Sequence, residues 1–389
     1  MFSASSTNSQ PVSAAQTDDH HIRHNVIAGI DYAETREANG SEFSLTVTPL
    51  ANEAVIEMFR RLSISLKELD ATVTKLIVFG ATNACAAGTE SMRRVFGKSD
   101  WPVTWVEGAS CYDQPIAGIQ AFALAEGDVH RVKLNGRVVG SVFENGAARH
   151  CLLAGLGPDN LLRSRPDQAR QTLDQLEAAL AQAGFSLSDV IRTWFFNDDL
   201  LSWYNEFNQV RTSVYSRVRF STGALPASTG VAGRNLAGAA LVLGAWAVKP
   251  LNASVQIKEV ASSLQCPAPA YGSSFSRALE ISSAHGKRLL ISGTASIAPE
   301  GQTLWVGGAR EQVALTMGVV EAILVSRGLA FSDTTRATAY FKHAADVIAF
   351  HDYCRNRHGC SFPVVPVHCD ICRDDLLFEI ELDAVSSGN

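Results

Sequence analysis

Hydrophobic and polar positions along this 389-residue chain follow one pattern that occurs three times. In residues 52–79, apolar side chains recur at the spacing of a helix, and the pattern then changes to the β-rich run TKLIVF. Residues 166–196 and 310–341 follow the same plan, and in both the helical segment ends at a glycine before the strand begins. The pattern therefore predicts three copies of one structural unit.

The predicted unit extends on both sides of this helix and strand. A strand pair precedes the helix in the second and third copies, and a second, shorter helical stretch leads to a closing apolar strand in all three. Each unit is thus predicted to run β-β-α-β-α-β, which makes the chain an α+β protein. The predicted segments are a disordered tail at residues 1–24, a degenerate N-terminal unit at 25–125, a second unit at 126–250 and a C-terminal unit at 251–389.

A sheet that carries both helices on one face buries only that face against them. We therefore expect the other faces of the three sheets to pack together in a pseudo-trimeric, barrel-like core. Clefts between such units are places where small molecules bind. Because three units in one chain can cover one another, a monomer with internal pseudo-threefold symmetry is expected.

The composition of the chain limits the kinds of molecule that it is expected to bind. The net charge is -6 and no basic stripe occurs, which argues against nucleic acid and against anionic membranes. No apolar run reaches the roughly 18 residues that a membrane span needs, and the first 20 residues lack the basic and apolar regions of a signal peptide. The 8 cysteines are scattered, as free thiols in a reducing compartment are. We expect a cytoplasmic protein that acts on a small molecule.

Three acids lie on one face of the last predicted strand. Glu379, Glu381 and Asp383 alternate there with apolar residues, whereas the matching positions of the first and second copies carry no acid. Two interpretations are open. The strand is half-exposed with its polar side chains outward, or at least one carboxylate lines a cleft between units and acts as an acid.

A C-x-x-C pair at residues 369–372 raises the question of a metal site. Its spacing from the upstream histidines and cysteines matches no common structural zinc site, and a strand would direct Cys369 and Cys372 to opposite faces. A redox pair of the thioredoxin type needs a helix N-terminus, which this segment is not predicted to provide. We therefore expect no metal and no cofactor. The upstream residues are His351, Cys354, His358, Cys360 and His368.

The unit that ends in EIE resembles the reactive-intermediate deaminases of the Rid/YjgF fold. Three joined units, together with YGSSFSRA at 271–278, LLISGTASI at 289–297 and CRDDLLFEIE at 372–381, resemble more narrowly the chorismatases, which split chorismate into pyruvate and a ring product. The resemblance covers roughly residues 130–385 well and 25–125 faintly. One departure is RTWFFNDD, which lacks the Asn-Tyr-Leu-Pro-like run expected after RTW.

The resemblance implies that Glu379 is the general acid, and that Tyr204, Arg211, Tyr271 and Arg277 contact the substrate. The chemistry of these residue types agrees with that assignment, since the fork of an arginine suits a carboxylate and a carboxylic acid can protonate an enol ether. Burial beside two further acids would raise the pKa of Glu379. Packing aromatics, and for Arg211 a solvated helix face, remain the alternatives.

Two residues bear on the product that the resemblance implies. Cys372 resembles the cysteine of the enzymes that make 3-hydroxybenzoate, whereas Ala295 points towards simple hydrolysis of the ether. We favour 3-hydroxybenzoate, because a thiol can take part in proton or oxygen transfer and an alanine only shapes space. The alternatives are hydrolysis to a trans-dihydroxycyclohexadiene carboxylate, a deaminase of enamines or imines, and a ligand-binding protein without activity.

Overall fold

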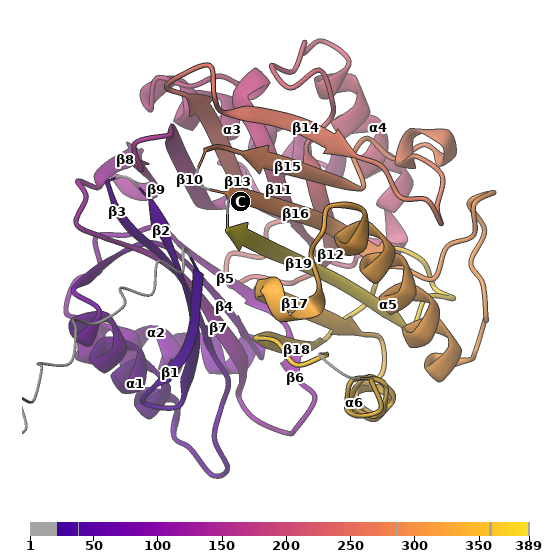
Figure 1. The fold of residues 1–389 in the computed structure, drawn as a ribbon, viewed down its shortest axis with the longest axis horizontal. Coiled ribbons are helices and arrows are strands. Elements are labelled where there is room, and N and C mark those ends of the chain that lie inside the picture. The colour runs from indigo at the N-terminus through magenta and orange to yellow at the C-terminus, as the bar shows by residue number, and fades with distance from the viewer. Residues whose placement is uncertain (1–21, 38, 285, 358–359, 388–389) are drawn as a thin grey trace, which may run out of the picture.

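The computed structural model describes residues 22–37, 39–284, 286–357 and 360–387. These residues form an α+β protein with three sheets and six α-helices (Figure 1). The predicted α+β class is confirmed. Residues 1–21 of the predicted tail lie outside the described residues, and its last three residues belong to a strand that begins at Ile22.

The first sheet has the strand order β1-β2-β3-β7-β4-β5. Two helices, α1 (Val55–Glu68) and α2 (Cys85–Phe96), accompany it. Its strands are β1 (Ile22–Ile27), β2 (Ile30–Glu37), β3 (Gly40–Val47), β4 (Ala71–Gly80), β5 (Val103–Glu107) and β7 (Ile116–Ala125).

The second sheet has the order β12-β11-β13-β10-β9-β8, with helices α3 (Arg165–Gln182) and α4 (Tyr204–Tyr215). Its strands are β8 (His130–Leu134), β9 (Arg137–Glu144), β10 (Ala148–Leu156), β11 (Val190–Asn197), β12 (Ala227–Ala232) and β13 (Leu241–Pro250).

The third sheet has the order β14-β15-β16-β19-β17-β18-β6, with helices α5 (Ala309–Ser326) and α6 (Val347–Arg355). The short strand β6 (Ala109–Ser110) comes from the first unit and pairs with β18, which ties the two units together. The other strands are β14 (Gln256–Val260), β15 (Ala278–Ser282), β16 (Gly286–Ala295), β17 (Thr334–Phe341), β18 (Val364–His368) and β19 (Phe378–Ser387).

Each unit contains the predicted β-β-α-β-α-β series and two strands more, and the first unit also contains the short strand β6. One extra strand precedes the series (β1, β8, β14), and the other is a short parallel strand after the second helix (β5, β12, β18). The prediction missed both because they have only five or six residues, too few for a clear hydrophobic period.

The helix α3 illustrates why the predicted helices form. Ser164 caps its N-terminus by accepting a hydrogen bond from the backbone N–H of Asp167, and Pro166 occupies the first turn, where no N–H is needed. Leu173, Leu176 and Leu180 lie on one face and are buried against the sheet. Burial of side chains of this size contributes about 1.5–3 kcal/mol each.

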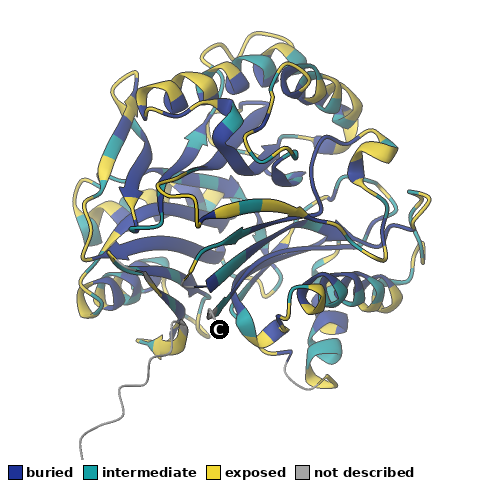
Figure 2. Cartoon of the chain, turned by 45° about the horizontal axis from the view of Figure 1, so that its top comes forward, coloured by how far each residue is buried: buried dark blue, intermediate teal, exposed yellow. Residues whose placement is uncertain are grey.

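The three sheets turn their helices outward and their other faces inward. Figure 2 shows buried residues on the inner strands and exposed residues on the outer helices. Beneath each helix pair lies one apolar cluster, and a fourth cluster joins all three units through residues such as Phe79, Trp194, Trp246 and Tyr340. One unit alone would expose its share of this central cluster. Among the described residues, no helix is long and apolar enough to cross a membrane.

Candidate active site

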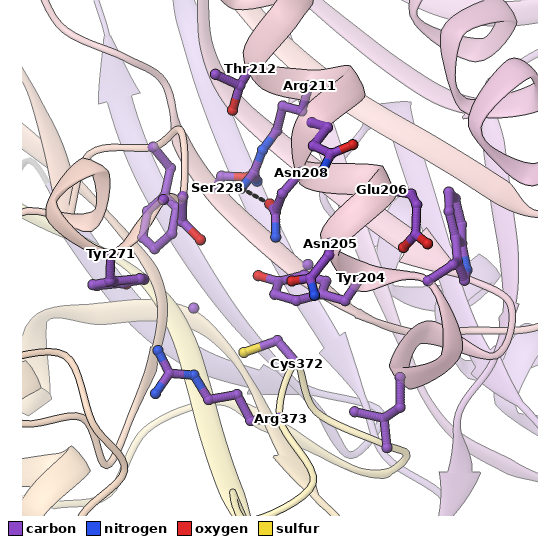
Figure 3. A pocket seen from close by; sticks show the side chains of 18 of the residues that line it. Tyr204, Asn205, Glu206, Asn208, Arg211, Thr212, Ser228, Tyr271, Cys372 and Arg373 are labelled. Atoms are coloured by element: carbon purple, nitrogen blue, oxygen red, sulfur yellow. Dashed lines mark hydrogen bonds between the residues drawn. The ribbon is translucent and has the colours of Figure 1, made fainter.

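A pocket of about 1100 Å³ lies between the second and third units. The second unit contributes α4 and β12, and the third contributes the segment around Tyr271, the strands β16 and β19, and the connection between β18 and β19. Figure 3 shows Tyr204 and Arg211 projecting from α4, with Tyr271, Cys372 and Arg373 facing them. All seven residues singled out from the sequence line this pocket: Glu379, Cys372, Tyr204, Arg211, Tyr271, Arg277 and Ala295.

The position that corresponds to Glu379 in the first unit is closed. Glu379 pairs with Tyr340 of β17, and Gly118 of β7 pairs with Phe79 of β4 in the same register. A side chain at Gly118 would have no room, because its Cβ would lie 2.6 Å from Val365 of β18. The cleft between the first and third units is therefore filled by apolar packing at this point.

Glu379 is buried in the pocket wall, with 4% of its surface exposed. Its partner on the neighbouring strand β16 is Ala295, which is also buried. Burial, followed by the negative charge of Glu381, raises the pKa of Glu379 to about 8. The half-exposed interpretation of this strand is wrong, and a pKa of about 8 favours the protonated form of Glu379 at neutral pH.

Glu381 is the opposite case on the same face of β19. Its carboxylate accepts hydrogen bonds from the indole of Trp194 (2.8 Å) and the hydroxyl of Thr229 (2.6 Å), and it forms buried ion pairs with Arg192 and Arg336. Burial alone would raise the pKa of Glu381, but the two arginines outweigh it and lower the pKa to about 2. A permanently ionised carboxylate therefore stands next to a protonated one.

Asp383 does not act on Glu379 as the sequence suggested. The carboxylate of Asp383 forms an ion pair with Arg336, whose Nε lies 2.6 Å away. Of the two neighbouring acids, Glu381 is the one whose charge raises the pKa of Glu379. The prediction treated three acids on one face as one cluster, and it did not include the cation that neutralises the third.

Three basic side chains from the three units meet at this junction. Lys75, Arg192 and Arg336 occupy the same register position in β4, β11 and β17. The Nζ of Lys75 lies 3.3 Å from the ring centroid of Trp194, and burial, followed by the charge of Arg336, holds the pKa of Lys75 well below the usual range. This cluster was not predicted, although each copy carries one basic residue at this position of its strand after the first helix.

Two buried arginines in the pocket, Arg211 and Arg277, each have an N–H donor without a hydrogen-bond acceptor among the described residues. Arg211 donates from Nη2 to Asn208 (2.7 Å), and Arg277 donates from Nε to the backbone oxygen of Cys266 (3.0 Å). Nε of Arg211 and Nη2 of Arg277 are buried without a hydrogen-bond partner among the described residues. Arg211 is 2% exposed, so the solvated-face alternative is wrong. Such unused, desolvated donors suit an anionic ligand.

The tyrosines of the pocket are neutral hydrogen-bonding groups. Burial raises the pKa of Tyr204, and it raises the pKa of Tyr271 to about 12. The ring centroid of Tyr271 lies 5.3 Å from the guanidinium carbon of Arg277 and 5.5 Å from that of Arg373. Arg373 also lines the pocket, and its Nη1 donates a hydrogen bond to the backbone oxygen of Gly301 (2.7 Å). The sequence analysis did not predict Arg373 as a pocket residue, although it directly follows Cys372.

Cys372 belongs to the connection between β18 and β19, not to a strand. The argument that a strand directs Cys369 and Cys372 to opposite faces is therefore wrong, because the strand begins only at Phe378. Burial, followed by the charge of Glu379, raises the pKa of Cys372 to about 12, against a hydrogen bond with Tyr204 that lowers it. Cys372 is thus a neutral thiol between the acid and Tyr204.

The histidines and cysteines that were considered as metal ligands do not form a cluster among the described residues. No group of three or more His, Cys, Asp or Glu side chains that could hold a metal ion occurs among the described residues, which exclude His358. His351 instead contacts the hydroxyl of Tyr112, which lies at 2.5 Å, and the sulfur of Cys354 lies 3.0 Å from that of Cys360.

Comparison with known structures gives the fold. A chorismatase crystal structure superposes with a TM-score of 0.63 over 89% of this chain and 98% of that chain, at 17% identity. The chain has the fold of a chorismatase. Yeast Mmf1 matches 34% of this chain and 99% of its own length, at 17% identity and a TM-score of 0.29.

Comparison of sequences adds two matches. The family model described as Endoribonuclease L-PSP matches residues 153–242, within the second unit. The 3-hydroxybenzoate synthase of Streptomyces hygroscopicus is 26% identical over 224 residues, which are 51% of this chain and 64% of that protein. The chain therefore matches less than two thirds of this relative's length.

Proposed function

We propose that this protein is a chorismatase, which cleaves the enol ether of chorismate to release pyruvate. The proposal rests on one observation: a carboxyl group with a raised pKa, Glu379, lines the same pocket as two buried arginines, Arg211 and Arg277, each of which has an unused N–H donor. Chorismate has two carboxylates and one acid-labile enol ether, so the pocket offers a matching group for each. The fold and the 3-hydroxybenzoate synthase relative support the same substrate.

The reaction begins with proton transfer from Glu379 to the terminal methylene of the enol ether. The transfer produces an oxocarbenium ion, and the carboxylate left on Glu379 stabilises that cation. Arg211 and Arg277 hold the substrate carboxylates, while the phenols of Tyr204 and Tyr271 donate hydrogen bonds. A hydroxyl oxygen then adds to the cationic carbon, and it becomes the keto oxygen of pyruvate when the ether oxygen leaves with the ring. In hydrolysis this oxygen comes from water, whereas in the route to 3-hydroxybenzoate it comes from the neighbouring ring hydroxyl, whose C–O bond to the ring breaks as the ring loses a proton and becomes aromatic.

We propose 3-hydroxybenzoate as the ring product. Pyruvate and 3-hydroxybenzoate together contain all the atoms of chorismate, so this route consumes no water, whereas hydrolysis adds one. Cys372 supports the first route because it is a neutral thiol in the pocket wall, between Glu379 and Tyr204. A dihydroxycyclohexadiene carboxylate is the product of the alternative route.

The function is tested by mixing the purified protein with chorismate and coupling pyruvate release to lactate dehydrogenase. Pyruvate formation supports the proposal. Hydrolysis of 2-iminobutyrate without pyruvate release from chorismate would replace it with an imine deaminase, the second candidate, which the match of residues 153–242 favours. Binding of chorismate with neither activity would indicate a ligand-binding protein.

The pH dependence separates an acid from a base. Because the pKa of Glu379 is about 8, a general acid is fully protonated at pH 6–7, and kcat/KM falls about tenfold per pH unit above about pH 8. A deaminase that uses ionised Glu379 to activate water would show the reverse, with a rate that rises up to pH 8. A profile of kcat/KM from pH 5.5 to 9.5 distinguishes the two, measured for pyruvate release from chorismate or for hydrolysis of 2-iminobutyrate, according to which substrate the protein turns over.

Replacement of Cys372 by alanine is expected to change the product and to leave ether cleavage nearly intact, because protonation by Glu379 precedes the reaction of the ring. Pyruvate release should stay within about threefold of wild type, and the ring product should shift from 3-hydroxybenzoate towards the dihydrodiol. Chromatography of the products measures the ratio. Cys85→Ala, in helix α2 of the first unit, is the control. An unchanged ratio would reduce Cys372 to a packed thiol.

A further inference from the structure

Gly293 of β16 lies directly against the acid. The strand is irregular at this point, with a register shift between Ile291 and Thr294 where it pairs with β19. A Cβ added to Gly293 would overlap Oε1 of Glu379 and lie 3.1 Å from its Cδ. The carboxyl group of Glu379 therefore occupies the space that any other residue at position 293 would need.

The backbone of Gly293 does not itself require glycine. Gly155, beside the corresponding irregularity in β10, has a φ of 64°, which favours glycine whatever surrounds it. Gly293 is not among the glycines with positive φ. Its missing side chain is thus explained by the space that Glu379 takes up, and not by backbone conformation.

Gly293 is also connected to the ionised neighbour of the acid. Its backbone N–H donates to Oγ1 of Thr229 (3.2 Å), and the hydroxyl of Thr229 donates to Glu381 (2.6 Å). The glycine backbone therefore holds a fixed place between the buried ion cluster and the carboxyl group of Glu379.

We propose that Gly293 is a positioning residue, whose bare backbone seats the carboxyl group of Glu379 against β16 in the orientation from which it delivers its proton. This inference rests on the proposed acid role of Glu379, and it assigns to position 293 a requirement for glycine. A larger residue pushes the carboxyl group away from β16 and into the open pocket, where water reaches it.

The test is a double-mutant cycle between positions 293 and 379. Gly293→Ala should lower kcat for pyruvate release at least 100-fold, with KM within threefold. In an enzyme that already carries Glu379→Asp, whose shorter side chain leaves room for the added methyl group, the same substitution should cost less than threefold. Gly318→Ala in α5, where an added Cβ meets no atom within 4 Å, is the control and should match wild type.

A second readout does not depend on the substrate. The carboxyl titration of Glu379, measured by infrared difference against the matching Glu379→Gln variant, should move at least one pH unit lower in Gly293→Ala because the carboxyl group becomes hydrated. If wild type fails to cleave chorismate, this titration still decides the role of Gly293. Equal losses from Gly293→Ala in both backgrounds, or an unmoved titration, would overturn the proposal.

Discussion

Replacement of Glu379 by glutamine is expected to lower kcat for pyruvate release from chorismate by about 10²–10⁴-fold, the usual contribution of a positioned general acid. Glutamine keeps the size and the hydrogen-bonding capacity of the side chain but has no proton to transfer. KM should change little, because Arg211 and Arg277 hold the substrate carboxylates. The measurement is steady-state pyruvate release at pH 7, with Glu259→Gln on the exposed strand β14 as the control.

Stability separates this loss from misfolding. The carboxyl group of Glu379 ionises near pH 4.5 in the unfolded chain and near pH 8 in the folded protein. Between these values the folded state binds a proton that the unfolded state lacks, so its contribution to stability declines as the pH rises, by about 1.4 kcal/mol per unit. Glutamine cannot ionise, so Glu379→Gln avoids the free-energy cost of a buried carboxylate and should unfold at a higher temperature than wild type at pH 9. Full activity in this variant would end the acid assignment.

Replacement of Glu381 by glutamine is expected to destabilise the protein by about 3–5 kcal/mol, because it leaves Arg192 and Arg336 buried without their shared carboxylate. The change is measured as the shift of the urea midpoint. Glu280→Gln is the matched control: Glu280 is equally buried, but its partners Arg327 and Lys258 reach solvent, so a smaller loss is expected. Equal losses in the two variants would contradict the role of the central ion cluster.

Glu381→Gln should also change the acid beside it. The charge of Glu381 helps to raise the pKa of Glu379, so its removal should move the alkaline limb of the pH–rate profile to lower pH. A destabilised variant with an unmoved limb would indicate that burial alone sets the pKa of Glu379.

The sequence predicted the repeated unit and the class of fold, and it singled out Glu379 as a candidate acid, because each has a local signal. Helical spacing that changes to alternation reveals the repeated unit, and three acids on one strand face stand out when the copies are compared. The other pocket residues were predicted through a family resemblance, not through periodicity, and they lie in residues 203–211, 271–278, 289–297 and 372–381. The structure brings these distant segments to one cleft.

What the sequence did not predict depends on contacts between units. The ion pairs of Glu381 with Arg192 and Arg336 join strands that are far apart in the chain, so no local pattern indicates which acid is neutralised and which keeps a proton. The close contact between the carboxyl group of Glu379 and Gly293 likewise exists only because β16 pairs with β19, which the sequence does not reveal. The error about Cys372 arose because the closing strand was extended backwards into a connection.

The central claim is that Glu379 holds a proton at neutral pH inside the pocket. Infrared difference spectra of wild type against Glu379→Gln, recorded from pH 3.5 to 10, measure this directly through the stretching band of a protonated carboxyl group. The account predicts that the band is present at pH 7 and disappears with a midpoint near pH 8. A midpoint near 4.5, the ordinary value for glutamate, would contradict it.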